Sequence, residues 1–371
     1  MMDNEQLRYR IAFASIRGMG VELARQLLEV AGSERSFFDM SEHELRDATK
    51  GHSKIYTNFY RQQQLERADR ELDFIVQNHI DTTYFTDADY PRRLLEAEDA
   101  PCMLYSRGTC DLNSRHVISM VGTRHATQYG ISFCDTFIRD LATALPDAVV
   151  VSGLAYGIDI AAHRACLKHG LSTVAVMARG LNGIYPAMHR NDAVKIVRNH
   201  GMVLTDYLSS DEIHRSNFLA RNRIIAALSD CTIIVESADH GGSLVTASLA
   251  QSYNRDVMAV PGRVGDEFSR GCNRIIRTSQ AMSITCADDM IEALSWDLER
   301  KAQKAQQLEV FPELNKEEQA VVNILKQQGD VHINTLATSL GMPIYRLMST
   351  LVELDCRGII LTLPGCRYCM K

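Results

Sequence analysis

Three short apolar runs in the middle of the chain each end in a glycine-rich or polar turn and continue as a helix-like segment. They occupy residues 117–124, 149–163 and 232–246. A glycine turn between a strand and a helix presents backbone N–H groups at the positive end of the helix dipole, which favours a bound anion. Three such turns on one parallel sheet meet at its carboxyl edge, where open α/β sheets bind ligands. The pattern therefore predicts a phosphate-binding site in the middle of the chain.

Strand-like and helix-like segments alternate from about residue 116 to residue 294. The strand-like runs are short and mostly β-branched, for example VISMVG, STVAVMA and CTIIVES. Such alternation predicts parallel strands with helices on both faces. We therefore predict an α/β fold whose core, residues 81–294, is an extended Rossmann-like sheet. Residues 82–111, at the beginning of that core, are expected to be irregular or extended.

A helical unit is predicted before the core, over residues 1–80. Its sequence IRGMG, at residues 16–20, separates two segments with apolar residues at helical spacing, as in a helix-hairpin-helix or SAM-like domain. The N–H groups of such a turn either contact a DNA phosphate or simply close a helical hairpin. The sequence leaves both interpretations open.

Another unit is predicted after the core. Residues 295–314 are polar and charged and predict a linker. Residues 315–371 predict three helices and a β-hairpin, which together form a winged helix. Because the third of these helices carries Arg346 as its only cation, we favour protein contact or packing over recognition of duplex DNA.

The charge and the cysteines restrict the class of protein. A formal net charge of −6 argues against attraction of the whole molecule to nucleic acid, but residues 179–223 hold 7 Lys and Arg against 4 Asp and Glu. The ten cysteines lack a disulfide framework, and no signal peptide or membrane-spanning run is recognisable. We therefore expect a cytoplasmic protein with reduced thiols and no membrane span. Cys366 and Cys369 form a lone C-x-x-C with Cys356 nearby, but a fourth zinc ligand cannot be identified. Neither a metal site nor a cofactor is therefore predicted.

The glycine turns supply most of the predicted ligand contacts. Gly122 permits close approach of a ligand, and Arg124 can bind a phosphate through two parallel hydrogen bonds. The alternative for Arg124 is an ion pair with an acidic neighbour at the strand end. The third turn forms an anion-binding nest of N–H groups. The contacts predicted from the turns are Gly122, Thr123, Arg124, Ser152, Gly153, Ala155, Gly157, Gly241, Gly242, Ser243 and Thr246.

Asp159 and His163 lie four residues apart, on one face of the helix that follows the second turn. They support the loop at the start of that helix or, in the alternative, form a catalytic Asp–His pair. No nucleophilic Ser or Cys accompanies them, so a hydrolytic triad is unsupported. The loop with Tyr185 and Pro186 either covers a ligand or is an ordinary surface connection.

The run FLARNRII places two cations around an amide before an apolar helix. In this run Arg221, Asn222 and Arg223 are predicted to clamp a phosphate, and Phe218 is predicted to stack on a base. A solvated helix start is the alternative. Arg263 adds a further predicted DNA contact downstream.

Together, these motifs resemble in order and spacing those of the DNA-processing protein A family, also called DprA or Smf. The motifs are VGTR, SGLAYGIDIAAH, GLNGIYP, FLARNRIIAALS, IVES, GGSLVTA and AVPG. The resemblance covers roughly residues 85–290, and both flanking units are similar to accessory domains of that family. It implies a non-enzymatic protein that binds single-stranded DNA, protects incoming DNA and loads the RecA recombinase onto it during natural transformation. It also implies a homodimer formed through the core.

An enzyme of another class remains as an alternative. Nucleotide phosphoribohydrolases of the lysine-decarboxylase-like type share such glycine-rich sheets, with the hallmark P-G-G-x-x-T-x-x-E. This chain has Ser248 and Leu249 where the Glu is needed, so the general acid/base group for N-glycosidic cleavage is missing. A third possibility is an interaction scaffold with a vestigial pocket.

Overall fold

The computed structural model describes residues 4–49, 53–296, 314–363 and 365–370. The chain divides into two compact units, Met1–Leu294 and Ser295–Lys371, and each has its own hydrophobic core. The predicted linker lies almost wholly outside the described residues. In the described ranges, no helix combines the length and apolar character that crossing a membrane requires.

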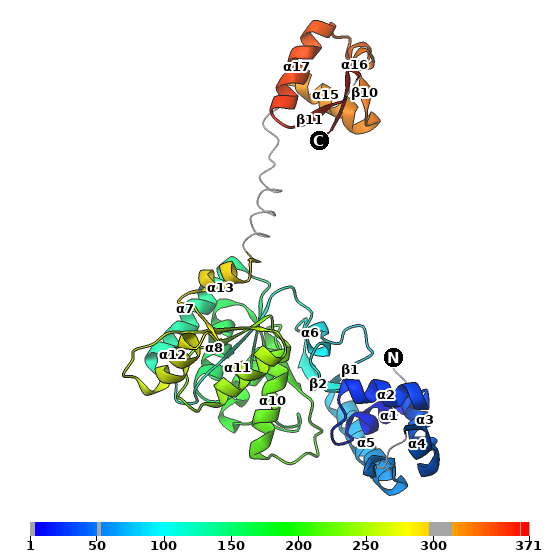
Figure 1. Cartoon of the computed structure of the whole chain (residues 1–371), viewed down its shortest axis with the longest axis vertical. Helices are drawn as coiled ribbons and strands as arrows, with labels where there is room; N and C mark the ends of the chain where they lie inside the picture. The colour runs from blue at the N-terminus through cyan, green and yellow to red at the C-terminus, as the bar shows by residue number, and fades with distance from the viewer. Residues whose placement is uncertain (1–3, 50–52, 297–313, 364, 371) are drawn as a thin grey trace. The chain divides into compact units, whose positions relative to one another are not determined.

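A nine-stranded sheet forms the centre of the first unit (Figure 1). Its strand order is β1-β2-β6-β5-β4-β3-β7-β8-β9. The strands are β1 (Asp81–Tyr84), β2 (Met103–Gly108), β3 (Val117–Val121), β4 (Val149–Ser152), β5 (Ser172–Val176), β6 (Met202–Thr205), β7 (Cys231–Ile234), β8 (Asp256–Ala259) and β9 (Met282–Ser283). The strands from β6 to β9 in this order pair in parallel, which confirms the predicted Rossmann-like sheet.

The order of the strands reverses at β3. Strands β4, β5 and β6 follow one another on one side of β3, whereas β7 and β8 lie on its other side. In open α/β sheets, ligands bind beside such a reversal, outside the carboxyl ends of the strands. The turns after β3, β4 and β7 are the three glycine-rich or polar turns of the sequence.

Strands β1 and β2, at one side of the sheet, lie in the segment that was expected to be irregular or extended. They pair antiparallel with each other, and β2 also pairs antiparallel with β6. Four of the six residues of β2 are buried. Pro101 and Gly108 flank this short apolar run, and they weaken its strand signal in the sequence.

The helices of the core form two packed pairs. α7 (Gln128–Ala144) packs against α8 (Ile158–His169), and α10 (Arg215–Ala227) packs against α11 (Gly242–Ser252). Every residue of β3, β4, β6 and β7 is buried, as expected for strands covered on both faces. The other core helices are α6 (Arg92–Leu95), α9 (Arg190–Arg198), α12 (Arg270–Arg277) and α13 (Ala287–Ala293).

The N-terminal helices share their hydrophobic core with the sheet domain. They are α1 (Asn4–Ala14), α2 (Val21–Ala31), α3 (Glu34–Asp39), α4 (Glu42–Thr49) and α5 (Asn58–Asn78). Phe13 and Phe37 of these helices belong to the same buried cluster as Tyr84 of β1 and Leu104 of β2. The helical N-terminus is confirmed, and it packs on the core rather than standing apart.

Three backbone N–H groups of the turn between α1 and α2 donate hydrogen bonds to carbonyl oxygens of the protein. The N–H of Met19 donates to Ile16 O at 3.0 Å, and the N–H of Gly20 donates to Gly18 O at 3.1 Å. The N–H of Val21 donates to Ala100 O of the core at 3.1 Å. Because these donors are engaged, the geometry favours the plain hairpin over a turn that holds a DNA phosphate.

The second unit is a winged helix with its own core of Leu325, Leu336, Leu347, Leu351 and Leu354. Three strands pair in the order β10-β12-β11, one more than the predicted hairpin contains. The added strand β10 has only two residues, too few for a periodic signal in the sequence. The elements are α15 (Lys316–Gln328), β10 (Val331–His332), α16 (Ile333–Leu340), α17 (Ile344–Cys356), β11 (Ile360–Leu363) and β12 (Arg367–Met370).

Candidate nucleic-acid interface

A groove of about 650 Å³ lies at the carboxyl edge of the sheet, beside the reversal at β3. The turns after β3 and β7 line it, together with the first half of α10. We call it the sheet-edge groove. The predicted contacts that line it are Gly122, Thr123, Arg124, Ala155, Phe218, Arg221, Asn222, Gly241, Gly242, Ser243 and Thr246, and the predicted support residues that line it are Asp159 and Tyr185.

The first turn holds Arg124 at the mouth of the groove. A Cβ on Gly122 would lie 2.5 Å from Ile158 Cγ1, so only glycine lets this turn approach α8. The N–H of Thr123 donates to Glu236 O at 2.7 Å, which ties the turn to the end of β7. Arg124 is exposed, and its guanidinium makes no hydrogen bond or ion pair with the described residues. The predicted alternative, an ion pair of Arg124 with an acidic neighbour, is not formed within the described ranges, although burial raises the pKa of nearby Asp159 and the charge of Arg124 is among those that oppose this rise.

An aromatic pair lies beside this free cation. The Arg124 guanidinium carbon lies 5.4 Å from the centre of the Phe218 ring, within the range of a cation–π contact. The rings of Phe218 and Tyr185 lie 5.3 Å apart, and the Tyr185 side chain is 44% exposed. The groove therefore offers an unpaired positive charge next to flat apolar surfaces.

The third turn brings the start of α11 to the groove. Gly242 begins the helix, and Gly241 precedes it in an extended conformation. The Ser243 hydroxyl donates to the Ser237 hydroxyl at 2.9 Å, and Thr246 Oγ1 donates to Gly242 O at 3.4 Å. The hydroxyl groups of Ser243 and Thr246 therefore already donate hydrogen bonds within the protein. The positive end of the helix dipole is therefore what this turn contributes to an anion.

The second turn forms the floor of the groove and is held by Arg221. Arg221 is buried, and its Nη1 donates to Gly153 O at 2.6 Å and to Val176 O. A Cβ on Gly153 would overlap this guanidinium. Arg221 thus joins the ends of β4 and β5 and holds the site together. Ser152, another predicted contact, does not line the groove: it is buried, and its hydroxyl donates to Met120 O at 2.6 Å.

Asp159 and His163 do not form a pair. Asp159 accepts a hydrogen bond from Ala155 N at 3.4 Å, whereas His163 Nδ1 lies 2.7 Å from Thr173 Oγ1. Burial lowers the pKa of His163 to about 3, so this ring is neutral at pH 7. Burial raises the pKa of Asp159, and the neighbouring charge of Arg221 opposes that shift. The geometry favours loop support for Asp159 over a catalytic pair.

Arg223 lies outside the groove, contrary to its predicted position beside Arg221. It forms an ion pair with Asp206 and donates to Asp99 O. Two residues along a helix turn the side chain by about 200°, so Arg221 and Arg223 cannot face the same side of α10. Arg223 lines a separate cleft of about 1090 Å³ between the α1–α2 turn and the core, which we call the N-terminal cleft.

The other predicted residues surround the groove without lining it. Gly157 has φ of 77° and packs beneath the first turn, and Pro186 lines a small recess next to Tyr185. Arg263 is exposed in the loop after β8 and is not part of the groove lining.

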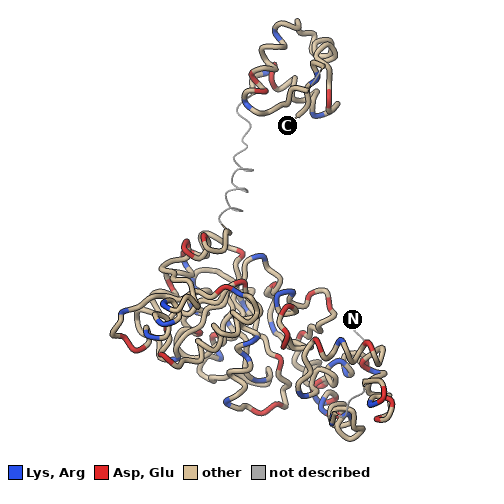
Figure 2. The backbone as a smooth tube through the Cα atoms, viewed as in Figure 1, with Lys and Arg blue, Asp and Glu red and all other residues tan. Residues whose placement is uncertain are grey.

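The charges differ between the two clefts. Arg124, Arg215 and Arg221 line the sheet-edge groove, and Asp159 is the carboxylate among its lining residues. Charged residues of both signs are distributed over the rest of the first unit (Figure 2). The acidic lining of the N-terminal cleft consists of Glu22, Glu98, Asp99, Asp206, Asp211 and Glu212. Of these two clefts, local charge therefore favours the sheet-edge groove as the site of a polyanion.

Comparison with known proteins decides the family. Residues 81–295 match the family described as DNA recombination-mediator protein A, and residues 303–366 match the DprA winged helix domain. The chain belongs to the DprA/Smf family. DNA processing protein DprA of Streptococcus pneumoniae is 37% identical over 202 residues, which cover 54% of this chain and 70% of that protein. Protein Smf of Escherichia coli is 31% identical over 278 residues, which cover 74% of each chain.

Two solved DprA structures share this architecture. The X-ray structure of the Streptococcus pneumoniae protein matches with a TM-score of 0.65 at 28% identity, covering 78% of this chain and 98% of that one. A structure of the Helicobacter pylori protein, which concerns its single-stranded DNA binding mode, matches with a TM-score of 0.52 at 30% identity. That match covers 59% of this chain and 96% of the Helicobacter pylori chain.

Several residues of this DprA/Smf groove were missed from the sequence. Arg215 lies one helical turn before Phe218 on α10, so the spacing of three residues could have placed it on the same face. The loop before α10 gave no such signal, because it follows no regular period. The missed lining residues are Val121, Ile213, His214, Arg215, Leu219, Ser237 and Ala238.

Proposed function

We propose that this chain binds single-stranded DNA in the sheet-edge groove. The observation that carries the proposal is the free guanidinium of Arg124, which lies over the Phe218 ring. The start of α11 lines the same groove. Phosphate oxygens would meet the cation and the helix dipole, and a base would stack on the aromatic surface. The DNA-binding relative from Helicobacter pylori supports the same ligand class.

This mode of binding has a physical signature. Binding that depends on phosphate contacts releases counterions, so the logarithm of the association constant falls linearly with the logarithm of the salt concentration. Stacking tolerates every base, so we expect little sequence preference. The salt dependence follows from the guanidinium of Arg124, and the lack of sequence preference follows from the ring of Phe218.

Fluorescence anisotropy with labelled oligothymidine tests the proposal. Arg124→Ala should weaken binding and reduce the steepness of the salt dependence. Arg198→Ala is the matched control, because Arg198 is an exposed arginine on α9 outside the groove. Equal affinities of the Arg124 variant and the wild type would contradict the proposal.

We further propose that the bound strand is handed to a recombinase. The description of the matching family as a recombination mediator supports this role. In this proposal a cytoplasmic homodimer, formed through the core, protects incoming DNA and loads RecA onto it during natural transformation. The decisive measurement is RecA assembly on strands that are already covered by single-strand-binding protein. No acceleration of assembly by the purified chain would refute the loading step.

We propose that the groove has no catalytic activity. Asp159, its lining carboxylate, is buried and supports the second turn, and α11 has no carboxylate in its sequence GSLVTASLAQS. Cleavage of an N-glycosidic bond therefore lacks a poised acid/base group. Release of adenine from AMP by the purified chain would instead favour the phosphoribohydrolase alternative.

We propose that the winged helix contacts protein rather than duplex DNA. The outer side of α17 exposes Tyr345, Met348 and Val352, with exposed fractions of 77%, 48% and 59%. Arg346, its only cation, forms an ion pair with Glu317. An apolar helix face without free cations suits a protein surface better than a phosphate backbone.

A further inference from the structure

A single loop separates the sheet-edge groove from the N-terminal cleft. It comprises residues 206–214 and connects β6 to α10. Ile213 and His214 line the groove, whereas Asp206 and Asp211 line the N-terminal cleft, which His214 also borders. The loop leads directly into the helical turn that carries Phe218. Its position therefore sets one wall of the proposed DNA site.

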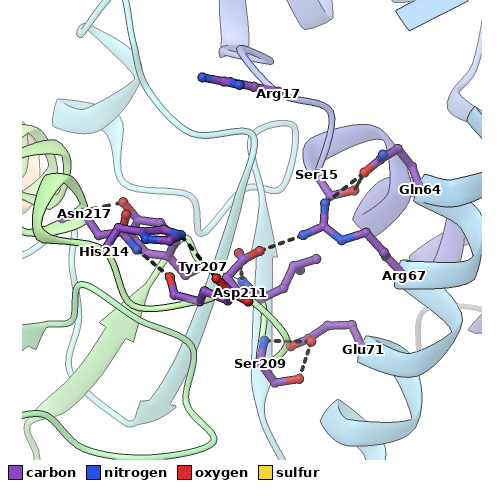
Figure 3. A network of polar contacts seen from close by, with 12 residues as sticks. Ser15, Arg17, Gln64, Arg67, Glu71, Tyr207, Ser209, Asp211, His214 and Asn217 are labelled. Carbon is purple, nitrogen blue, oxygen red and sulfur yellow. Dashed lines mark hydrogen bonds and ion pairs between the residues drawn. The ribbon is translucent and has the colours of Figure 1, made fainter. Parts of the chain in front are cut away.

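Two side chains of α5 hold this loop from the far side (Figure 3). Arg67 Nη2 donates to Asp211 Oδ1 at 2.6 Å. Glu71 Oε2 accepts hydrogen bonds from the N–H of Ser209 at 2.8 Å and from its hydroxyl at 2.6 Å. The N-terminal helices thus contact the wall of the groove through one ion pair and two hydrogen bonds.

The loop transmits these contacts to α10. Asp211 Oδ2 accepts from the N–H of Leu208 at 2.8 Å, so one carboxylate closes the loop and binds α5 at the same time. Farther along, Asn217 Nδ2 donates to Glu212 O at 3.0 Å. Asn217 lies next to Phe218 on the first turns of α10. An unbroken series of contacts therefore runs from α5 to the residues that line the groove.

The burial of Glu71 favours one position of the loop over others. Glu71 is 3% exposed, and burial raises the pKa of its carboxyl group, while both donors of Ser209 oppose the rise. A buried carboxylate is unfavourable unless donors satisfy it. If the loop moved away from α5, Glu71 would lose the donors that Ser209 supplies. The native position of the loop is the one that keeps Glu71 hydrogen-bonded.

We propose that Arg67 and Glu71 are positioning residues for DNA binding: from the N-terminal helices they fix the wall formed by residues 206–214 and so set the affinity of the groove. This inference rests on the proposed function of the groove. It gives the N-terminal helices a role in binding although the N–H groups of Met19, Gly20 and Val21 in the turn between α1 and α2 already donate within the protein. A change in the N-terminal helices would then alter DNA affinity without any direct DNA contact.

Oligothymidine binding to the full chain over a range of salt concentrations tests the proposal. Arg67→Ala should weaken binding about fivefold at every salt concentration, because a wall is loosened while no phosphate contact is lost. Arg67→Lys keeps a charge that can reach Asp211 and should restore most of the affinity. Arg70→Ala is the matched control, since Arg70 is an exposed arginine of the same helix and should bind as the wild type does.

A second pair of variants keeps the test valid if the Arg67 variants unfold. Ser209→Ala removes one donor to Glu71 and leaves both charged residues of α5 in place, and it should weaken binding about threefold. Glu71→Gln should do the same, whereas Glu66→Gln, at an exposed position of α5, should not. Thermal unfolding of each variant confirms that the compared chains are folded.

The outcomes separate this proposal from the proposed function. If Arg124→Ala weakens binding but Arg67→Ala, Glu71→Gln and Ser209→Ala do not, the positioning role is refuted and the groove stands. A flatter salt dependence for Arg67→Ala would mean a direct phosphate contact and would also refute it. If no variant in either set changes binding, including Arg124→Ala, the groove itself is not the DNA site.

Discussion

The sheet-edge groove and the N-terminal cleft are neighbours with opposite chemistry. The N-terminal cleft is the larger, at about 1090 Å³ against about 650 Å³. Three arginines line it, of which Arg67 and Arg223 are paired with carboxylates and Arg17 is exposed, and six acidic residues line it as well. The smaller groove keeps Arg124 unpaired. Cleft size is therefore a poor guide to where a polyanion binds. The balance of charges is a better one, because three arginines face one carboxylate in the groove but six carboxylates in the N-terminal cleft.

Charge reversal should give the largest difference between the two clefts. Arg124→Glu in the sheet-edge groove should weaken oligothymidine binding about a hundredfold, because an attraction to phosphate becomes a repulsion. Arg17→Glu reverses an exposed arginine of the N-terminal cleft and should change the dissociation constant less than about twofold. Anisotropy titrations measure both. Equal losses for the two variants would mean that the strand also occupies the N-terminal cleft.

The buried core around His163, on α8, should respond to acid. Burial holds the pKa of His163 at about 3 in the folded chain, far below the ordinary histidine value of 6.5. Between these values the unfolded chain binds a proton that the folded chain does not, so stability falls as the pH drops below about 6.5. We expect the free energy of unfolding to be about 2 kcal/mol lower at pH 5 than at pH 8 from this residue alone.

Urea unfolding at both pH values measures that difference. His163→Gln removes the titrating ring, so this variant should lose less stability than the wild type over the same interval. An identical pH dependence of the two chains would show that His163 is not held neutral in the folded state.

Removal of the stacking ring should have a smaller effect on binding than charge reversal. Phe218→Ala deletes the ring beneath Arg124 and should weaken oligothymidine binding about tenfold, within the range measured for base stacking on aromatic residues. The salt dependence should be nearly unchanged, because a ring makes no ionic contact. Phe59→Ala is the control, since Phe59 is 76% exposed on α5. A parallel loss of salt dependence would mean that Phe218 acts only by holding Arg124.

The acids of the N-terminal cleft should have the smallest effect. Glu98→Gln and Glu212→Gln remove charges that line this cleft, and they should strengthen binding by less than about twofold if the strand stays in the groove. A larger gain in an anisotropy titration would indicate that the strand passes close to these carboxylates. That outcome would show how far the bound strand extends from the sheet-edge groove towards the N-terminal cleft.

The sequence predicted the parallel sheet and the location of the groove because both depend on local pattern. Glycines after apolar runs identify the turns at Gly122, Gly153 and Gly242 without knowledge of distant contacts. The roles of Arg221 and Arg223 were not predictable in this way. They lie in one motif and look alike in sequence, but α10 turns one towards the floor of the groove and the other towards Asp206.

Long-range contacts explain what else the sequence left open. The brace by Arg67 and Glu71 joins residues that are 144 and 138 positions apart from Asp211 and Ser209, and no local period relates them. The sequence of the turn between α1 and α2 is compatible with a phosphate contact, but the N–H of Val21 donates to Ala100 O, which lies far along the chain in the core. In each case a partner far along the chain determines what the side chain or the amide does.

The buried position of Arg221 affects how loss-of-function variants of this fold are interpreted. A genetic screen that scores only the final phenotype would place Arg221 and Arg124 in one class, as two arginines of one groove. Expression level and protease resistance should separate them, since substitution of Arg221 removes hydrogen bonds to the ends of β4 and β5, whereas substitution of the exposed Arg124 removes none within the described residues.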